Sequence, residues 1–261
     1  MSAKITSINY CPVKSVSFQS VKNCKIKKNT GIIGDRIFAF AKDLDTEQAK
    51  LFEKSPAERK GKWNKVLTLK NSPALNKYNF IFKDEKLTLT FKDNEILSID
   101  INQLTEREAL SNKISELESS LKQPITLMKN DAFPFFDTSI SKKVDFVNSV
   151  SLLNFQSIND FEKKVGKKIE TSIFRGNICI DGLEPWKERE WIGKTIKINN
   201  VSFKIEKNIP RCVAINLKPK TDDNSFNLLQ LLKKNYNHFD MGVYLTALDD
   251  GGINIGDTIN F

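Results

Sequence analysis

The stretch YNFIFKDEKLTLTFKDNEILSIDI, residues 78–101, contains three short apolar or alternating runs separated by two polar pairs. The three runs are Tyr78–Phe82, Leu87–Phe91 and Ile96–Ile101. Each has the length and composition of a half-buried strand, and the pairs at 84–85 and 93–94 are typical of tight turns. The stretch therefore predicts an antiparallel meander of three strands.

The same pattern of short strands and tight turns recurs along the rest of the chain. Further strands are predicted at residues 4–10, 37–41, 63–69, 144–153, 177–180, 195–198, 201–205, 243–247 and 253–261. Helices are fewer. Thr105 and Glu108 form a capping box before an apolar stripe that Pro124 ends, and Ser157 is predicted to cap a second helix. The chain is predicted to be mainly β (α+β), an antiparallel β-barrel with peripheral helices.

Composition limits the class of protein. The 261 residues suffice for one compact unit or two closely packed subdomains, and the hydrophobic and charged fractions, 39% and 28%, are ordinary for a soluble protein. No apolar run approaches the ~20 residues that span a bilayer, and residues 1–10 are too polar for a signal peptide. A cytoplasmic protein without membrane association is expected.

The formal net charge of +9 leaves several partners open. The lysines are mixed with acidic and apolar residues, which argues against a nucleic-acid-binding protein, although a basic β-barrel of that kind stays a third alternative. An anionic small ligand, or merely a lysine-rich composition, fits equally well. No Gly-x-Gly-x-x-Gly or Walker A motif supports a nucleotide cradle.

The number and spacing of the cysteines and histidines argue against several kinds of metal and redox site. The four cysteines, at positions 11, 24, 179 and 212, form no C-x-x-C pair, and His238 is the single histidine. Zinc ribbons, thioredoxin-like redox and multi-histidine metal sites are disfavoured, so in an enzyme a cofactor would perform the chemistry. In Arg211-Cys212 the adjacent cation favours a reactive thiolate, although a cysteine in apolar surroundings is more often a core residue.

Several short motifs, taken in order, carry a resemblance to a known family. They are Pro12-Val13-Lys14-Ser15, Gly34-Asp35-Arg36, Phe174-Arg175-Gly176-Asn177, Arg211-Cys212, Met241-Gly242-Val243-Tyr244 and Ile255-Gly256-Asp257. Their order and spacing are similar to those of MOSC-domain proteins with an N-terminal MOSC β-barrel domain, among them the molybdenum-dependent reductases of amidoximes and N-hydroxylated bases. The resemblance implies an N-terminal domain over residues 1–124 and a MOSC domain over 125–261, the first strand contributing to the second barrel.

The resemblance also implies a cofactor site. A molybdenum cofactor (Mo-molybdopterin) would lie between the domains, with Cys212 as metal ligand and catalytic residue, and Arg211 keeping its thiol deprotonated. The implied cofactor-binding residues are Lys14, Ser15, Arg36, Asn154, Ser157, Arg175, Asn177, Arg211 and Cys212. Arginine supplies a planar fork and lysine a point charge to a phosphate.

Ordinary structural roles compete with several of these assignments. Lys14 and Arg36 could be surface charges, Arg175 a structural ion pair and Ser157 an N-cap. The chain also departs from the family, which often has Cys-Ser before Arg-Cys, because Ile209 and Pro210 stand there. Ile215 and Asn216 replace a threonine pair that the reductases tend to carry. These changes bear more on the substrate than on the cofactor.

Two functions follow from the resemblance. The first is an oxidoreductase that removes oxygen from N-hydroxylated or N-oxide-type small molecules. Its electrons would come from a separate ferredoxin, flavoprotein or cytochrome b5 type protein, since the chain carries no cluster motif of its own. The second is a molybdenum-cofactor carrier or sulfur-transfer module without turnover.

Overall fold

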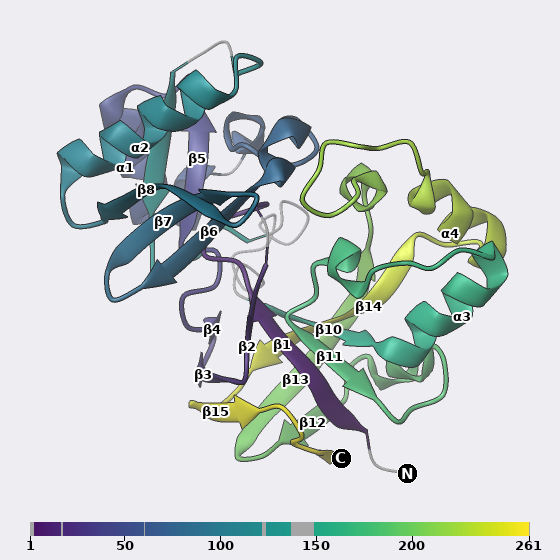
Figure 1. Cartoon of the computed structure of the whole chain (residues 1–261). Coiled ribbons are helices and arrows are strands. Elements are labelled where there is room, and N and C mark those ends of the chain that lie inside the picture. The colour runs from purple at the N-terminus through teal and green to yellow at the C-terminus, as the bar shows by residue number, and fades with distance from the viewer. Residues whose placement is uncertain (1–2, 17, 60, 122–123, 137–148, 261) are drawn as a thin grey trace.

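The chain forms two bodies that pack against each other. The computed structural model describes residues 3–16, 18–59, 61–121, 124–136 and 149–260. Figure 1 shows one body with strands β5 to β8 and helices α1 and α2, and a second body around a large curled sheet with α3 and α4 on its outside. The prediction of a mainly β chain with peripheral helices is confirmed.

Within the described residues, the large sheet has eight strands. Their spatial order is β16 (Ile259–Asn260), β12 (Thr195–Ile198), β13 (Val201–Pro210), β14 (Asp240–Ala247), β10 (Val150–Asn154), β11 (Ile178–Asp181), β1 (Lys4–Tyr10) and β2 (Gln19–Val21). A smaller sheet beside it joins β15 (Gly251–Asn254), β3 (Asn23–Lys27) and β4 (Gly31–Ile32).

Hydrogen bonds between the first and last strands close the large sheet. The Ile5 N–H donates to the Asp257 carbonyl at 2.9 Å and the Ile259 N–H to the Ala3 carbonyl at 2.9 Å, around a bridge between Lys4 and Thr258. β1 and β16 are therefore joined, and closure removes two edges that would otherwise offer unpaired backbone groups.

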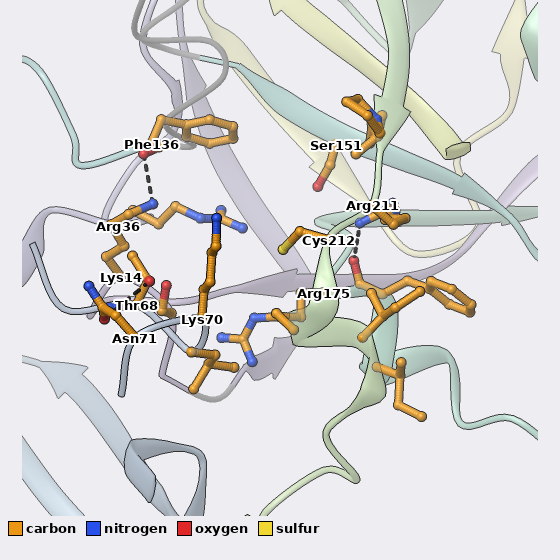
Figure 2. A pocket seen from close by; sticks show the side chains of 18 of the residues that line it. Lys14, Arg36, Thr68, Lys70, Asn71, Phe136, Ser151, Arg175, Arg211 and Cys212 are labelled. Atoms are coloured by element: carbon orange, nitrogen blue, oxygen red, sulfur yellow. Dashed lines mark hydrogen bonds between the residues drawn. The ribbon is translucent and has the colours of Figure 1, made fainter. Parts of the chain in front are cut away.

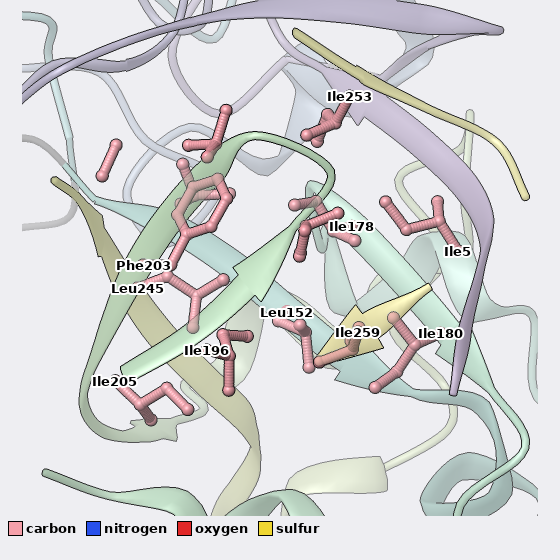
Figure 3. Close-up of a cluster of buried hydrophobic side chains, with 14 of the residues drawn as sticks. Ile5, Leu152, Ile178, Ile180, Ile196, Phe203, Ile205, Leu245, Ile253 and Ile259 are labelled. Carbon is pink, nitrogen blue, oxygen red and sulfur yellow. The ribbon is translucent and has the colours of Figure 1, made fainter. Parts of the chain in front are cut away.

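The barrel encloses an apolar core. Ile5, Leu152, Ile178, Phe203 and Leu245 come from five different strands and are essentially inaccessible to solvent. Figure 3 shows them gathered inside the curled sheet. Burial of each such side chain contributes about 1.5–3 kcal/mol, so this core is the main stabilising element of the body.

One strand pair departs from the expected antiparallel pattern. β10 and β11 run parallel, and α3 (Phe155–Val165) connects them, followed by the 3-10 turn Thr171–Phe174. A parallel pair needs such a crossover because a tight turn cannot join it. The crossover brings residues 174–177 to the same end of the barrel as the end of β13, where Arg211 bonds the Phe174 carbonyl.

The other body contains the predicted meander. β6 (Tyr78–Lys83), β7 (Lys86–Phe91) and β8 (Asn94–Asp100) pair in order, while β5 (Phe38–Lys42) pairs with β9 (Ile125–Lys129). α1 (Thr46–Lys54) and α2 (Leu104–Leu117) pack on these strands. The Phe40 and Phe80 rings, 5.8 Å apart, join the two sheets in one core.

Some predicted local features were wrong. α2 begins at Leu104, one residue before the predicted capping box, and Glu106 accepts a hydrogen bond from the Asp100 N–H. The predicted strand at 63–69 is a 3-10 turn, Trp63–Lys65, because the chain bends there and makes a bridge only at Val66. The part of the predicted 144–153 strand before residue 149 lies outside the described residues.

Sheet membership differs from the predicted division of the chain at residue 124. β1 to β4 belong with the second body, whereas β9, which follows the predicted boundary, pairs with β5 in the first. The boundary itself stays a prediction, and we propose that the first body spans about residues 35–136. Among the described residues, no helix combines the length and the apolar character needed to cross a membrane.

Candidate functional site

A cavity of about 700 Å³ lies where the two bodies meet. Five cationic side chains line it, Lys14, Arg36, Lys70, Arg175 and Arg211, and its described lining contains no carboxylate. Figure 2 shows Cys212, Lys70 and Arg175 entering this space from different segments. Such a lining attracts an anion, because several like charges converge on one space.

Cys212 lies at the end of β13 and is exposed on the cavity wall. Pro210, two residues earlier, is paired with Asp240 of β14, and the 3-10 turn Val213–Asn216 follows directly. The Cys212 carbonyl accepts the Ile215 N–H at 3.1 Å. Strand and turn together fix the backbone on both sides of an accessible thiol.

Arg211 holds this segment against its neighbours. Its guanidinium donates to the Met241 carbonyl, at 2.9 Å from Nε, and to the Phe174 carbonyl, at 2.6 Å from Nη1. Its own N–H donates to the Phe239 carbonyl at 2.9 Å. The side chain thus ties the Cys212 backbone to β14 and to the turn before Arg175.

Lys14 reaches the cavity from the segment after β1. Its ammonium donates to the Phe136 carbonyl at 2.7 Å and lies 5.6 Å from the centre of the Trp63 ring. The side chain is largely buried, so Lys14 is not the surface charge that its sequence context also allowed. Ser15 follows it on the cavity wall with φ at +66°.

Arg36 is positioned by a buried carboxylate. Asp35, 5% exposed, forms an ion pair with Arg36 and accepts the Cys11 N–H at 2.7 Å and Asn177 Nδ2 at 3.1 Å. Burial acts to lower the pKa of Arg36, but the Asp35 carboxylate and smaller contributions from its other neighbours together raise that pKa. Asp35 therefore links the first body to the loop before β11 and keeps Arg36 charged.

Arg175 adopts a left-handed backbone conformation, φ +52°, directly before Gly176. Its guanidinium lies 4.9 Å from the centre of the Phe18 ring, and Nη2 is 3.8 Å from Cys11 Sγ. Burial, and to a smaller extent the nearby Arg36 charge, lowers the pKa of Arg175. Burial also raises the pKa of the Cys11 thiol, so this cysteine is neutral and does not balance the cations around it.

Lys70 enters the cavity from a turn of the first body. Asn71 Oδ1 accepts the Thr68 N–H at 2.7 Å, and the Ser72 N–H donates to the Thr68 carbonyl at 2.7 Å. This hydrogen-bonded turn presents Lys70, Thr68 and Asn71 to the cavity opposite Cys212.

The barrel side of the cavity is formed by neighbouring strands. Ser151 and Tyr244 are paired across β10 and β14, and Ile209 lies on β13 beside them. Phe136, from the other body, meets Tyr244 edge-on with ring centres 6.1 Å apart. The cavity thus has an apolar, aromatic wall next to its cationic one.

Three predicted binding residues lie outside the cavity lining. Asn154 and Ser157 both donate to the fully buried Glu188 carboxylate, at about 3 Å. Asn154, not Ser157, caps α3, because its side chain accepts the Gln156 N–H. Asn177 lies behind the cavity, where Oδ1 accepts from Ser151 and Nδ2 donates to Asp35.

Sequence reasoning brought together Lys14, Ser15, Arg36, Arg175, Arg211 and Cys212, which all line the cavity. It did not single out Lys70, Thr68 or Trp63, since turn residues carry no periodic signal. Tyr244 lay within the quoted motif Met241-Gly242-Val243-Tyr244, whereas Phe136 stood in none of the quoted motifs, and for both residues aromatic character was the available signal.

The fold and the site define a class of protein: a closed β-barrel with a cysteine at a strand end, facing an anion-attracting cavity shared with a second body. Residues 143–260 match the family model of the MOSC domain, and this part of the chain is a MOSC domain. The predicted resemblance to that family is confirmed.

Known proteins similar to this chain were found by sequence and by structure. The mitochondrial amidoxime reducing component 2 of Bos taurus is 28% identical over 92 residues, which are 35% of this chain and 27% of that protein. The crystal structure of YuaD from Bacillus subtilis aligns over 99% of this chain and 94% of its own, with 11% identity and a TM-score of 0.43. YiiM from Geobacillus stearothermophilus covers 42% of this chain and 52% of its own, with 13% identity and a TM-score of 0.34.

Proposed function

We propose that this chain binds a molybdenum–pterin cofactor in the cavity and reduces N-oxygenated small molecules. The observation that carries the proposal is the exposed Cys212 thiol on the wall of a cavity lined by five cations. The similarity to the Bos taurus protein, an amidoxime reducing component, supports the substrate class.

The donor set fits such a cofactor. A thiol is a soft ligand that suits a metal already held by sulfur, and guanidinium groups suit a phosphate or a pterin carbonyl. Within the described ranges, no group of three or more His, Cys, Asp or Glu side chains could hold a metal ion by itself. The described cavity lining thus offers one thiol, that of Cys212, and five cationic groups, and 700 Å³ is within the usual size of a cofactor pocket.

Each wall of the cavity has a role in this proposal. Lys14, Ser15, Arg36 and Arg175 would hold the anionic end, and Cys212 would be the protein's ligand to the metal. When bound, the cofactor supplies the two-electron oxygen-removal chemistry that the side chains cannot perform. Phe136 and Tyr244 would restrict water beside the thiol and orient a small substrate. Asn177, Asn154 and Ser157 would act indirectly, through the buried carboxylates that they contact.

Elemental analysis tests cofactor binding. The protein would be produced in a host that makes the cofactor, together with Cys212→Ser and the matched control Cys24→Ser. We expect stoichiometric molybdenum in the unchanged chain and in the Cys24 control, and its loss in Cys212→Ser. Cys24 is a suitable control because it is half-buried on β3, with a pKa raised by burial to about 12. An unchanged chain free of molybdenum would refute the proposal.

An activity assay distinguishes the reductase from the alternative, a cofactor carrier or sulfur-transfer module. Reduction of benzamidoxime by the loaded protein, with a chemically reduced viologen dye as electron source, is expected for the reductase. Tight molybdenum binding without turnover of any N-oxygenated substrate would instead favour the cofactor carrier or sulfur-transfer module.

A further inference from the structure

The loop after α4 (Leu228–Tyr236) lies against the segment that carries Cys212. Phe239 is 36% exposed, and its carbonyl accepts the Arg211 N–H at 2.9 Å. At the other end of the helix, Asn216 Oδ1 accepts the Leu229 N–H at 3.0 Å. The first turn of α4 and the loop after the helix are therefore both bonded to residues close to Cys212, and the exposed Phe239 is one hydrogen bond away from Arg211.

The last turn of α4 adds positive charge beside Phe239. Lys233 and Lys234 are both exposed, and Lys233 Nζ lies 5.5 Å from the centre of the Phe239 ring. Lys233 also donates to the Asn237 carbonyl at 3.1 Å, an ordinary C-terminal role. Within the part of the chain that the structure describes, neither lysine has a carboxylate within 4 Å.

The end of α3 extends this charged surface. Lys164 Nζ lies 4.2 Å from the centre of the Tyr236 ring, so the C-terminal turns of α3 and α4 meet. Lys163 is exposed next to it, and Asp160, 3.6 Å from Lys164, is already engaged by Tyr236 and Trp186. Figure 1 shows α3 and α4 together on the outer side of the barrel. One lysine per helix would offset each helix dipole, and the additional lysines exceed that need.

We propose that this lysine–aromatic surface, Lys163, Lys164, Lys233, Lys234 and Phe239, docks an acidic electron-carrier protein. The inference rests on the proposed reductase function. Conversion of R–NHOH to R–NH₂ and water consumes two electrons and two protons, and the electrons come from the carrier in two one-electron steps. The carrier's acidic face meets the lysines, and electrons enter through Phe239 and Arg211 toward Cys212. Complementary charge steers such encounters and mainly sets their rate.

The test compares two electron sources and two matched variants. An acidic plant-type [2Fe–2S] ferredoxin serves as the protein donor and reduced methyl viologen as the small donor. The variant is Lys233→Glu/Lys234→Glu. The control is Lys25→Glu/Lys27→Glu, which makes the same charge change at two exposed positions of β3, outside the cavity lining and the docking surface. Thermal unfolding of both variants verifies that the fold is retained.

We expect the α4 variant to raise the KM for ferredoxin roughly tenfold at low salt, because rim charges govern encounter. Its viologen-driven rate should equal that of the unchanged chain, and the β3 control should behave as the unchanged chain with both donors. An equal effect of both variants, no effect of the α4 variant, or no ferredoxin-driven turnover despite viologen-driven turnover would each overturn the inference. Absence of viologen-driven turnover in the unchanged chain would instead refute the proposed function.

Discussion

Replacement of Asp35 with alanine should destabilise the protein and disturb the cationic wall together. The carboxylate accepts the Cys11 N–H and Asn177 Nδ2 and pairs with Arg36, whose side chain is 13% exposed. Each buried donor left without an acceptor costs about 1–3 kcal/mol. An Arg36 charge left without its partner adds to this, because breaking a buried pair costs about 3–5 kcal/mol.

We expect a net loss of about 3 kcal/mol in the free energy of unfolding, because water in the cavity can hydrate the Arg36 guanidinium and reduce the cost of breaking its ion pair. The stability of Asp35→Asn should fall between those of the unchanged chain and Asp35→Ala, because an amide oxygen still accepts one hydrogen bond while the charge is lost. In a chain of this size, ~3 kcal/mol corresponds to a fall of about 6–12 °C in the unfolding temperature.

Urea denaturation of the protein without cofactor measures this loss. The control is Glu116→Ala, which removes an exposed carboxylate that pairs with Lys113 on α2 at 3.2 Å. Exposed pairs of this kind contribute less than about 1 kcal/mol. If Asp35→Ala stays within about 1 kcal/mol of the unchanged chain, the carboxylate is not the link between the two bodies that the geometry indicates.

Three further predictions follow from backbone and burial. Gly242→Ala should abolish soluble expression, because a Cβ there would lie 2.4 Å from the Leu152 carbonyl oxygen. Gly193 has a similarly positive φ but open space around it, so Gly193→Ala should lower the free energy of unfolding by only about 1–2 kcal/mol in chemical denaturation. Burial raises the pKa of Glu188, so the folded chain holds its proton to higher pH than the unfolded chain. The free energy of unfolding should therefore fall as pH rises above about 4.5, and Glu188→Gln should remove that part of the slope in denaturation series. Arg59→Met should lower thermal stability and, in the loaded protein, weaken benzamidoxime binding measured as KM, because the buried guanidinium donates to carbonyls at 52, 133 and 134, next to Phe136. An unchanged KM would show that Arg59 does not position the cavity wall.

Local patterns predicted the strands well. The meander at 78–101 forms as expected, because alternation and turn pairs act within a few residues. The α3 cap was misassigned to Ser157, because the Ser157 hydroxyl instead bonds the distant Glu188 and Trp186, and sequence spacing does not reveal such partners. The parallel β10–β11 pair also depends on a crossover that no local pattern marks.

The site was predictable where it lay in short ordered motifs. Lys14, Arg36, Arg175 and Cys212 were identified this way, and they line one cavity although they are far apart in the chain. Lys70 was missed because its place on the wall depends on a turn held by Asn71, and on how the two bodies pack. Asp35 stood in a quoted motif, yet its central role needs three partners from separate segments.

The bond between the first and last strands has a consequence for how the protein assembles. Lys4 forms a bridge with Thr258, which is far from it in the sequence. The segment after β1 then leads through Cys11 to Lys14 at the cavity. The segment from Lys4 to Lys14 thus both closes the barrel and provides the first residue of the cationic wall. During synthesis the barrel cannot close before β16 has emerged, because β16 lies far along the chain from β1. Such long-range pairing is slow to form, so the binding site is completed as the barrel closes rather than on a preformed domain.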